Sequence, residues 1–332
     1  MQIEGKRVLV TGGAGFIGSH LVECLARDNE VTVLDDFSVG TMENLNAVKG
    51  RMRVVKADIT DRASLHQAVQ SAQIVFHLAV VCLRASIRDP IRSHQVNDQG
   101  TLNLLLSALN SSVERFVHVS SSEVYGSAVR SPMAEDHPFT PGTPYAASKV
   151  AAETYALSFH HTYGFPAVVI RPFNTYGPRE HLNGPSGEVI PKFVARAMAG
   201  KPLLVFGDGH QTRDFTWVED TVRGIVQAAA CDALLGKPVN IARGEAVSIL
   251  ELAQRVQRLL GTDVPIEHRA PRPGDVRAHL GSVERARAMF GFKAGVGLAE
   301  GLARYVQWVK AQPGDPVSRL KHEQVLNWQP VH

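Results

Sequence analysis

The chain of 332 residues has few cysteines, no long apolar run and little net charge, and each absence excludes a class of protein. Its three cysteines, Cys24, Cys82 and Cys231, lie far apart and form no CxxC pair, so we expect small buried hydrophobic residues in a reducing compartment. No apolar stretch approaches the roughly 18 residues of a membrane span, and the N-terminus enters an apolar strand instead of a signal peptide. We therefore expect a cytoplasmic protein without a membrane partner.

The charge and histidine patterns indicate neither a nucleic-acid partner nor a metal site. The net charge is +3, and no basic block is present, so nucleic acid is not an expected partner. Fourteen histidines include the pair His160-His161 but no HxxxH or HExxH spacing, and we expect no metal site. With 44% hydrophobic and 20% charged residues, the chain has the composition of an ordinary globular protein of one large or two medium domains.

The N-terminal residues follow the pattern strand, glycine turn, helix, strand and acid. An apolar strand is expected over residues 7–11, a helix over 19–27 and a second strand over 30–34. The turn between the first strand and the helix reads Gly12-Gly13-Ala14-Gly15-Phe16-Ile17-Gly18. Glycines there allow a tight turn and a close approach of a pyrophosphate to the positive helix N-terminus, and Gly18 lets the helix lie close to the strand.

The second strand ends on Asp35 and Asp36. Asp35 is placed to accept hydrogen bonds from the ribose hydroxyls of an adenosine. A carboxylate at this position repels a 2′-phosphate, and no arginine follows it. The pattern therefore predicts a dinucleotide cofactor and favours NAD over NADP.

Strands and helices alternate through the first half of the chain. Strands are expected over residues 54–58, 74–78, 115–120 and 167–171, and helices over 63–70, 97–109 and 144–163. This alternation predicts an α/β fold with a Rossmann-type, doubly wound parallel sheet, which binds ligands beyond the carboxyl ends of its strands. Asp58, Ala79, Ser121 and Asn174 lie at or just past such ends.

After Asn174 the composition changes: proline and glycine become frequent, and the expected helices are shorter. Helices are expected over residues 190–199, 219–230, 249–260 and 283–290. We predict an NAD-binding domain over 1–174 and a smaller α/β domain over 175–332 that mainly binds substrate, with some segments returning to the sheet. The cleft between them is the expected site. Residues 312–332 are compatible with a short docked helix or with a loose tail.

Three residues of the first half predict proton-transfer chemistry. Tyr145 and Lys149 are four apart at the start of a long helix and share one face. A nearby ammonium and a positive nicotinamide ring stabilise a phenolate, so Tyr145 is expected to take a proton from a substrate hydroxyl while hydride leaves the same carbon. Ser121 follows a buried strand and can hydrogen-bond the same oxygen.

Together these features resemble the extended short-chain dehydrogenase/reductase superfamily and, more narrowly, its NAD-dependent nucleotide-sugar epimerase/dehydratase family. The resemblance extends over nearly the whole chain. Further motifs that carry it are His77-Leu78-Ala79, Asn97-Asp98-Gln99-Gly100-Thr101, Arg171-Pro172-Phe173-Asn174-Thr175-Tyr176-Gly177-Pro178, Gly207-Asp208-Gly209-His210-Gln211-Thr212-Arg213-Asp214-Phe215-Thr216 and Arg272-Pro273-Gly274-Asp275.

The resemblance implies further contacts and an assembly. Asp58 and Ile59 are expected to flank the adenine of the cofactor. The expected cofactor-binding residues are Gly12, Gly15, Phe16, Ile17, Gly18, Asp35, Asp36, Asp58, Ile59, Leu78, Ala79, Asn97, Tyr145 and Lys149. Asn174, Arg213 and Arg272 are expected to hold the diphosphate of a nucleotide-sugar substrate. A homodimer is expected through the helices 97–109 and 144–163, with Ala147, Ala151, Tyr155 and Phe159 as the outer seam of the second helix.

Members of this family share one opening step, oxidation of the sugar at C4, and Glu123 distinguishes between the later steps. Dehydratases and uronate decarboxylases carry a similar glutamate before Val-Tyr-Gly, and a dehydratase needs a base to remove the C5 proton. Ser122 departs from dTDP-glucose dehydratases, which have an aspartic acid there, although GDP-mannose-type dehydratases have serine. The stretches 212–215 and 272–275 also resemble UDP-hexose 4-epimerases.

We therefore expect Tyr145, Lys149, Ser121, Ser122 and Glu123 to be catalytic and favour a nucleotide-hexose 4,6-dehydratase. The alternatives are a UDP-hexose or UDP-uronate 4-epimerase and then a UDP-glucuronate decarboxylase. A different class, an NAD-sensing regulator or scaffold, is the non-enzymatic alternative.

Overall fold

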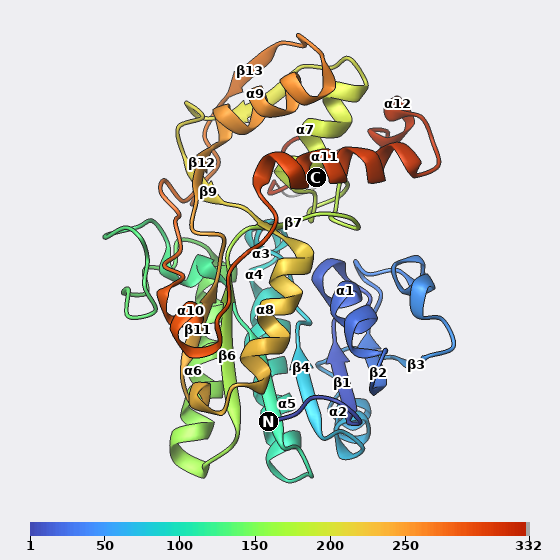
Figure 1. The fold of residues 1–332 in the computed structure, drawn as a ribbon, viewed down its shortest axis with the longest axis vertical. Coiled ribbons are helices and arrows are strands. Elements are labelled where there is room, and N and C mark those ends of the chain that lie inside the picture. The colour runs from blue at the N-terminus through green and yellow to red at the C-terminus, as the bar shows by residue number, and fades with distance from the viewer. Residues whose placement is uncertain (330–332) are drawn as a thin grey trace.

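A seven-stranded parallel sheet forms the larger half of the molecule (Figure 1). The structure is a computed structural model that describes residues 1–329. The strands are β1 (Arg7–Thr11), β2 (Glu30–Asp35), β3 (Met52–Lys56), β4 (Ile74–His77), β5 (Arg115–Val119), β6 (Ala167–Pro172) and β11 (Pro238–Ile241). Their order is β11-β6-β5-β4-β1-β2-β3, so the chain reverses direction across the sheet between β1 and β4. A ligand crevice is expected at the carboxyl ends beside that reversal.

Successive residues of each strand face opposite sides of the sheet, and helices bury both sides. Val8 and Val10 pack into one core with α1 (Phe16–Leu25), α8 (Val218–Ala230) and α10 (Glu284–Phe290). Leu9 packs into the other core with α2 (Arg62–Gln70), α5 (Gly100–Leu109) and α6 (Pro144–Tyr163). Burial of both faces explains why the strands read as continuous apolar runs. The sequence prediction of a Rossmann-type doubly wound fold is confirmed.

Both ends of helix α6 are determined by local sequence. The Thr143 side chain accepts the Ala146 N–H at 3.2 Å, and Pro144 occupies the first turn, where its missing N–H costs nothing. Gly164 adopts a left-handed conformation and ends the helix. This helix holds Tyr145 in its first turn and Lys149 one turn later.

The smaller half has its own apolar core and lies beyond the carboxyl ends of the sheet (Figure 1). It contains α7 (Val189–Met198), β8 (Leu203–Phe206), α9 (Ile249–Leu260), β13 (Ile266–Arg269) and α11 (Leu298–Ala311). Two short pairs, β7 (Thr175–Tyr176) with β10 (Thr216–Trp217) and β9 (Thr212–Asp214) with β12 (Ala246–Ser248), lie between the halves. Helix α8 and strand β11 return to the large sheet, so the chain crosses between the halves several times.

Several short elements complete the chain. They are η1 (Met42–Val48), α3 (Leu83–Arg88), α4 (Pro90–Ser93), η2 (His94–Gln99), η3 (Ser122–Tyr125), η4 (Asp232–Leu234) and α12 (Pro316–Arg319). After α12 the chain folds back toward the cleft, and residues 330–332 of the segment 312–332 lie outside the described residues. No helix within residues 1–329 combines the length and the apolar character that a membrane crossing requires.

The predicted outer seam of α6 is wrong at one position. Phe159 is 6% exposed and packs into the core under the sheet, whereas Tyr155 is 37% exposed. A helix has 3.6 residues per turn, so a strict spacing of four rotates around the helix and reaches the buried face within three steps. The outward positions are Ala147, Ala151 and Tyr155.

Candidate active site

A cavity of about 320 Å³ lies between the two halves. The loop after β5 contributes Ser121, Ser122 and Glu123, helix α6 contributes Tyr145, and the loop after β6 contributes Asn174. The smaller half contributes cationic and aromatic side chains, among them Arg213 and Arg272. The structure thus brings most of the predicted catalytic and substrate-binding residues to one cavity. Lys149 lies below it.

The glycine turn at the start of α1 leaves no space for side chains where a dinucleotide is expected. Gly12 has a φ of 69°, and a Cβ there would lie 2.6 Å from the Ala79 nitrogen. A Cβ on Gly18 would lie 2.1 Å from the Gly12 carbonyl oxygen. Helix α1 has no acidic residue in its first turn and no side-chain cap, so its positive N-terminus is open to an anion. The turn therefore fits the pyrophosphate of NAD.

Asp35 ties this turn to the end of β2. Its carboxylate accepts the Ala14 and Phe37 N–H groups, each at 2.9 Å, and burial raises the pKa of the carboxyl above its usual value. Each oxygen keeps a second lone pair for a ribose hydroxyl. Asp36 instead binds the backbone and hydroxyl of Ser38, at 2.9 and 2.6 Å.

Some of the other predicted cofactor residues line the cavity or lie at a strand end, and others are packed in the interior. Phe16 and Ile17 line the cavity, and Asp58 accepts hydrogen bonds from Thr60 and Arg92 at the end of β3. Ile59 and Leu78 pack into the cores on either side of the sheet. Asn97 is 1% exposed, and its amide bonds the N–H and the carbonyl of Val81 at 2.7 and 3.1 Å. Its contacts position the loop after β4.

Tyr145 is half-buried, and the burial of its phenol raises the pKa of this group well above the ordinary value. The Ser121 hydroxyl acts in the opposite direction by hydrogen bonding to the phenol, while the nearby Glu123 carboxylate raises the pKa further. Lys149 directs its ammonium to the Val119 carbonyl at 2.7 Å, and burial lowers the pKa of this lysine to about 7. Within residues 1–329 no hydrogen bond joins Lys149 to the phenol, so Ser121 is the direct polar neighbour of Tyr145.

A buried network supports the serine loop from below. The Ser120 hydroxyl donates to Glu153 at 2.7 Å, and Arg171 pairs with the same carboxylate. Arg171 also donates to the Tyr125 hydroxyl at 2.5 Å, which fixes the far end of η3. Because both members of the Glu153–Arg171 pair are almost fully buried, loss of either leaves an uncompensated charge and is expected to disrupt the loop.

Glu123 faces the cavity with an unused carboxylate. Its N–H donates to the Ser121 hydroxyl at 3.2 Å, but its side chain makes no hydrogen bond or ion pair with any residue of 1–329. A carboxylate with a structural role binds backbone amides, as the Asp35 carboxylate does. The Glu123 carboxylate is therefore available to a bound substrate. Ser122 is 3% exposed, and its carbonyl contacts the His279 ring at 3.1 Å.

Guanidinium groups converge on the opposite wall. Arg213 and Arg272 share the Asp275 carboxylate, and Arg213 donates to it at 2.7 Å. Burial, followed by repulsion from the Arg84 guanidinium, lowers the pKa of Arg272, and its buried Nε has no partner within the described chain. The buried Asn174 Oδ1 likewise has none. Two converging cations, one of them with an unused donor, fit a diphosphate.

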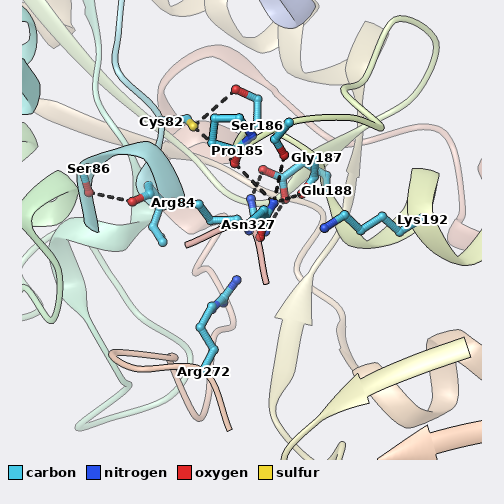
Figure 2. Close-up of polar contacts among 12 residues, drawn as sticks. Cys82, Arg84, Ser86, Pro185, Ser186, Gly187, Glu188, Lys192, Arg272 and Asn327 are labelled. Atoms are coloured by element: carbon cyan, nitrogen blue, oxygen red, sulfur yellow. Dashed lines mark hydrogen bonds and ion pairs between the residues drawn. The ribbon is translucent and has the colours of Figure 1, made fainter. Parts of the chain in front are cut away.

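Sequence reasoning missed several polar residues of this cavity. Arg84, at the start of α3, pairs with Glu188 through two bonds of 2.7 and 2.9 Å and so joins the two halves (Figure 2). Lys192 and Asn327 also line the cavity. The rule that ligands bind past strand ends could have found Arg84, which follows β4. No local sequence pattern indicated the others, because contacts between segments far apart in the sequence bring them to the cavity.

Comparison with known proteins shows the family to which the chain belongs. The profile of the GDP-mannose 4,6 dehydratase family matches residues 9–305. The UDP-glucose 4-epimerase of Mycolicibacterium smegmatis is 37% identical over 92% of this chain and 98% of its own. The UDP-N-acetyl-alpha-D-glucosaminuronate decarboxylase of Bacillus cytotoxicus is 35% identical over 93% and 99%. The structure of DesIV, a dTDP-glucose 4,6-dehydratase from Streptomyces venezuelae solved with NAD, has a TM-score of 0.87 and 34% identity over 92% and 97%.

Proposed function

Because the chain belongs to the family of NAD-dependent nucleotide-sugar epimerases, dehydratases and decarboxylases within the extended short-chain dehydrogenases, we propose that it is a nucleotide-hexose 4,6-dehydratase. Membership makes the protein an NAD-dependent enzyme. The substrate class follows from the cavity, which has a catalytic wall around Tyr145 and a cationic wall around Arg272. A nucleotide sugar would contact both walls, with its sugar at the catalytic wall and its diphosphate at the cationic wall.

The first step uses Tyr145 and Ser121. Arg213 and Arg272 hold the diphosphate, so that the sugar is oriented toward α6. The glycine turn would hold NAD, which would supply the acceptor for the hydride that leaves C4 of the sugar. Tyr145 takes the proton of the C4 hydroxyl, and Ser121 donates a hydrogen bond to the same oxygen. Lys149, beneath the loop, supplies a positive charge that favours the phenolate whenever its ammonium is protonated.

The second step distinguishes a dehydratase from an epimerase. The observation that supports a dehydratase is the Glu123 carboxylate, which faces the cavity without a partner within residues 1–329. A ketone at C4 acidifies the C5 proton, and Glu123 lies on the catalytic loop as a base able to remove it. Loss of the C6 hydroxyl then releases one water and leaves a C5–C6 double bond. That bond would take up the stored hydride at C6 and a proton at C5, which would return the cofactor to its oxidised form. Neither an epimerase nor a simple C4 oxidation requires this base.

A 4-epimerase is the second candidate, favoured by Ser122. A dehydratase needs a group that protonates the departing C6 hydroxyl, and the residue beside Glu123 is a serine instead of a carboxylic acid. The similarity to an M. smegmatis 4-epimerase points the same way. An epimerase returns hydride to the opposite face of C4 and leaves C5 untouched.

Mass spectrometry separates the reactions. The purified enzyme is incubated with UDP-, dTDP- and GDP-hexoses and with UDP-glucuronate, and the products are weighed. Loss of one water from a hexose supports the proposal, and loss of CO₂ from the uronate identifies a decarboxylase. A product of unchanged mass that separates from the substrate in liquid chromatography identifies an epimerase. Tyr145→Phe is the control, since removal of a general base commonly lowers the rate by about 10²–10⁴.

A further inference from the structure

The segment 320–328 forms part of the substrate cavity although it lies beyond the family match, which ends at residue 305. It follows α11 and α12 and folds back over the cleft. Glu323, Val325, Asn327 and Trp328 from this segment line the cavity together with Tyr145 and Arg272. The shape of the cavity on this side is therefore determined by residues outside the part of the chain that the family shares.

Polar contacts attach the segment to both halves of the molecule. Glu323 pairs with Arg196 at 2.8 Å, and the Gln324 carbonyl accepts the Lys192 ammonium at 3.0 Å. The Gln324 side chain accepts a bond from Arg88 of the sheet half at 3.3 Å. Trp328 packs edge-on against Phe206, with ring centroids 4.9 Å apart. These contacts hold the segment in place as one wall of the cavity.

Asn327 has a buried acceptor that the protein leaves unused. Its Nδ2 donates to the carbonyls of Gly184, Pro185 and Gly187 at 3.3, 3.3 and 3.1 Å (Figure 2). Three carbonyl partners fix the orientation of the amide, because only the nitrogen can donate to them. Oδ1 then points away from the loop and has no hydrogen-bond partner in residues 1–329, although the residue is 1% exposed. An unsatisfied buried acceptor is costly unless a ligand donates to it.

The surroundings of Asn327 indicate which part of the substrate it meets. The carbonyls that hold it precede Glu188, whose partner Arg84 lies near the catalytic Glu123. Figure 2 shows the Arg272 side chain pointing toward Asn327, and Lys192 approaching from another side. Asn327 therefore lies on the wall of the cavity toward which the cationic side chains point. On a nucleotide hexose, the substituent nearest the diphosphate is the one on C2, next to the anomeric carbon.

We propose that Asn327 is a specificity-determining residue whose Oδ1 accepts a hydrogen bond from the C2 substituent of the sugar. The inference rests on the proposed nucleotide-sugar function. The donor is the C2 hydroxyl of a hexose or the acetamido N–H of a 2-acetamido sugar. A 2-deoxy sugar has no donor at this position and leaves the acceptor unpaired.

Binding of UDP-glucose, UDP-N-acetylglucosamine and UDP-2-deoxyglucose, measured by calorimetry, tests this assignment in the wild type and in Asn327→Ala. The wild type should bind the 2-deoxy sugar roughly threefold to tenfold more weakly than the better of the other two, as expected for one hydrogen bond. In Asn327→Ala this difference should fall to less than about twofold. Leu326→Ala, a change at a 43% exposed neighbour, is the matched control and should keep the wild-type difference.

A difference that persists in Asn327→Ala would overturn the assignment, because a merely structural loss weakens all ligands equally and leaves their ratio unchanged. Equal binding of the 2-deoxy and 2-hydroxy sugars by the wild type would overturn it as well. The ratio between UDP-glucose and UDP-N-acetylglucosamine shows which donor is used. Since only binding is measured, binding without turnover counts against the proposed reaction and leaves the Asn327 assignment standing.

Discussion

At the scale of single residues, burial controls the charge state of the groups around the cavity. It raises the pKa of the Tyr145 phenol and lowers the pKa of Lys149 and Lys192 to about 7 and about 8. Both directions follow from the cost of placing a charge in a low-dielectric site. A bound anion favours the charged form of Lys192, so ligand binding and protonation are linked at this residue.

Lys192 gives this linkage a measurable form. Burial and then repulsion from Arg84 lower its pKa to about 8, and a bound diphosphate favours its ammonium form. Above that pH, nucleotide binding requires proton uptake, so the affinity for UDP should fall roughly threefold to eightfold between about pH 7.5 and 9. In Lys192→Met the fall should be absent. Calorimetry in two buffers of different ionisation enthalpy measures the proton uptake. A wild-type affinity independent of pH in this range would contradict the linkage.

At the scale of elements, the reliability of sequence reasoning depended on whether the determinants were local. Helix α6 matched its prediction at both ends because Thr143, Pro144 and Gly164 are cap residues in the sequence. The glycine turn was likewise predicted from its own residues, Gly12 to Gly18. Helix α11 was not predicted, although its buried residues Leu298, Leu302 and Tyr305 recur at helical spacing. The segment 320–328 carries no periodicity, since it is held by contacts with residues 88 and 184–206.

The glycine turn gives a prediction about the cofactor. Asp35→Asn removes a negative charge that repels a 2′-phosphate and weakens the carboxylate bonds to the turn. NAD should bind about tenfold more weakly, as expected for a bond to a charged group, while the preference for NAD over NADP should narrow. Dissociation constants from fluorescence titration measure both effects. Asp36→Asn, at the carboxylate that Ser38 holds, should change the preference less. An unchanged preference in Asp35→Asn would refute the role of Asp35.

At the scale of the whole molecule, the sequence predicted the sheet and the motifs at its strand ends but not the other wall of the site. Ser121, Glu123, Tyr145 and Asn174 follow strands or begin helices, so their convergence could be anticipated. Residues such as Arg84, Glu188 and Asn327 reach the cavity through packing between the halves. Such long-range packing has no signature in a single sequence.

The outer face of the sheet half gives a prediction about assembly. Ala147, Ala151 and Tyr155 of α6 face outward, and Leu106 of the neighbouring α5 is 39% exposed. We expect a homodimer through this face at micromolar concentration. Light scattering should show a dimer for the wild type and a monomer for the double variant Leu106→Arg and Tyr155→Arg, with its NAD content retained. A monomeric wild type would contradict the expected pairing.

The proposed removal of the C5 proton of a 4-keto sugar by Glu123 is best tested by hydrogen exchange at C5. The wild type is incubated with its accepted nucleotide hexose in heavy water, and deuterium at C5 is measured by NMR alongside Glu123→Gln. We predict deuterium at C5 in the wild-type reaction. In the glutamine variant we predict an accumulated 4-keto sugar without C5 exchange, because an amide cannot accept the proton. Turnover of a hexose without C5 exchange in the wild type, and a largely active glutamine variant, would contradict this role of Glu123 and identify a 4-epimerase.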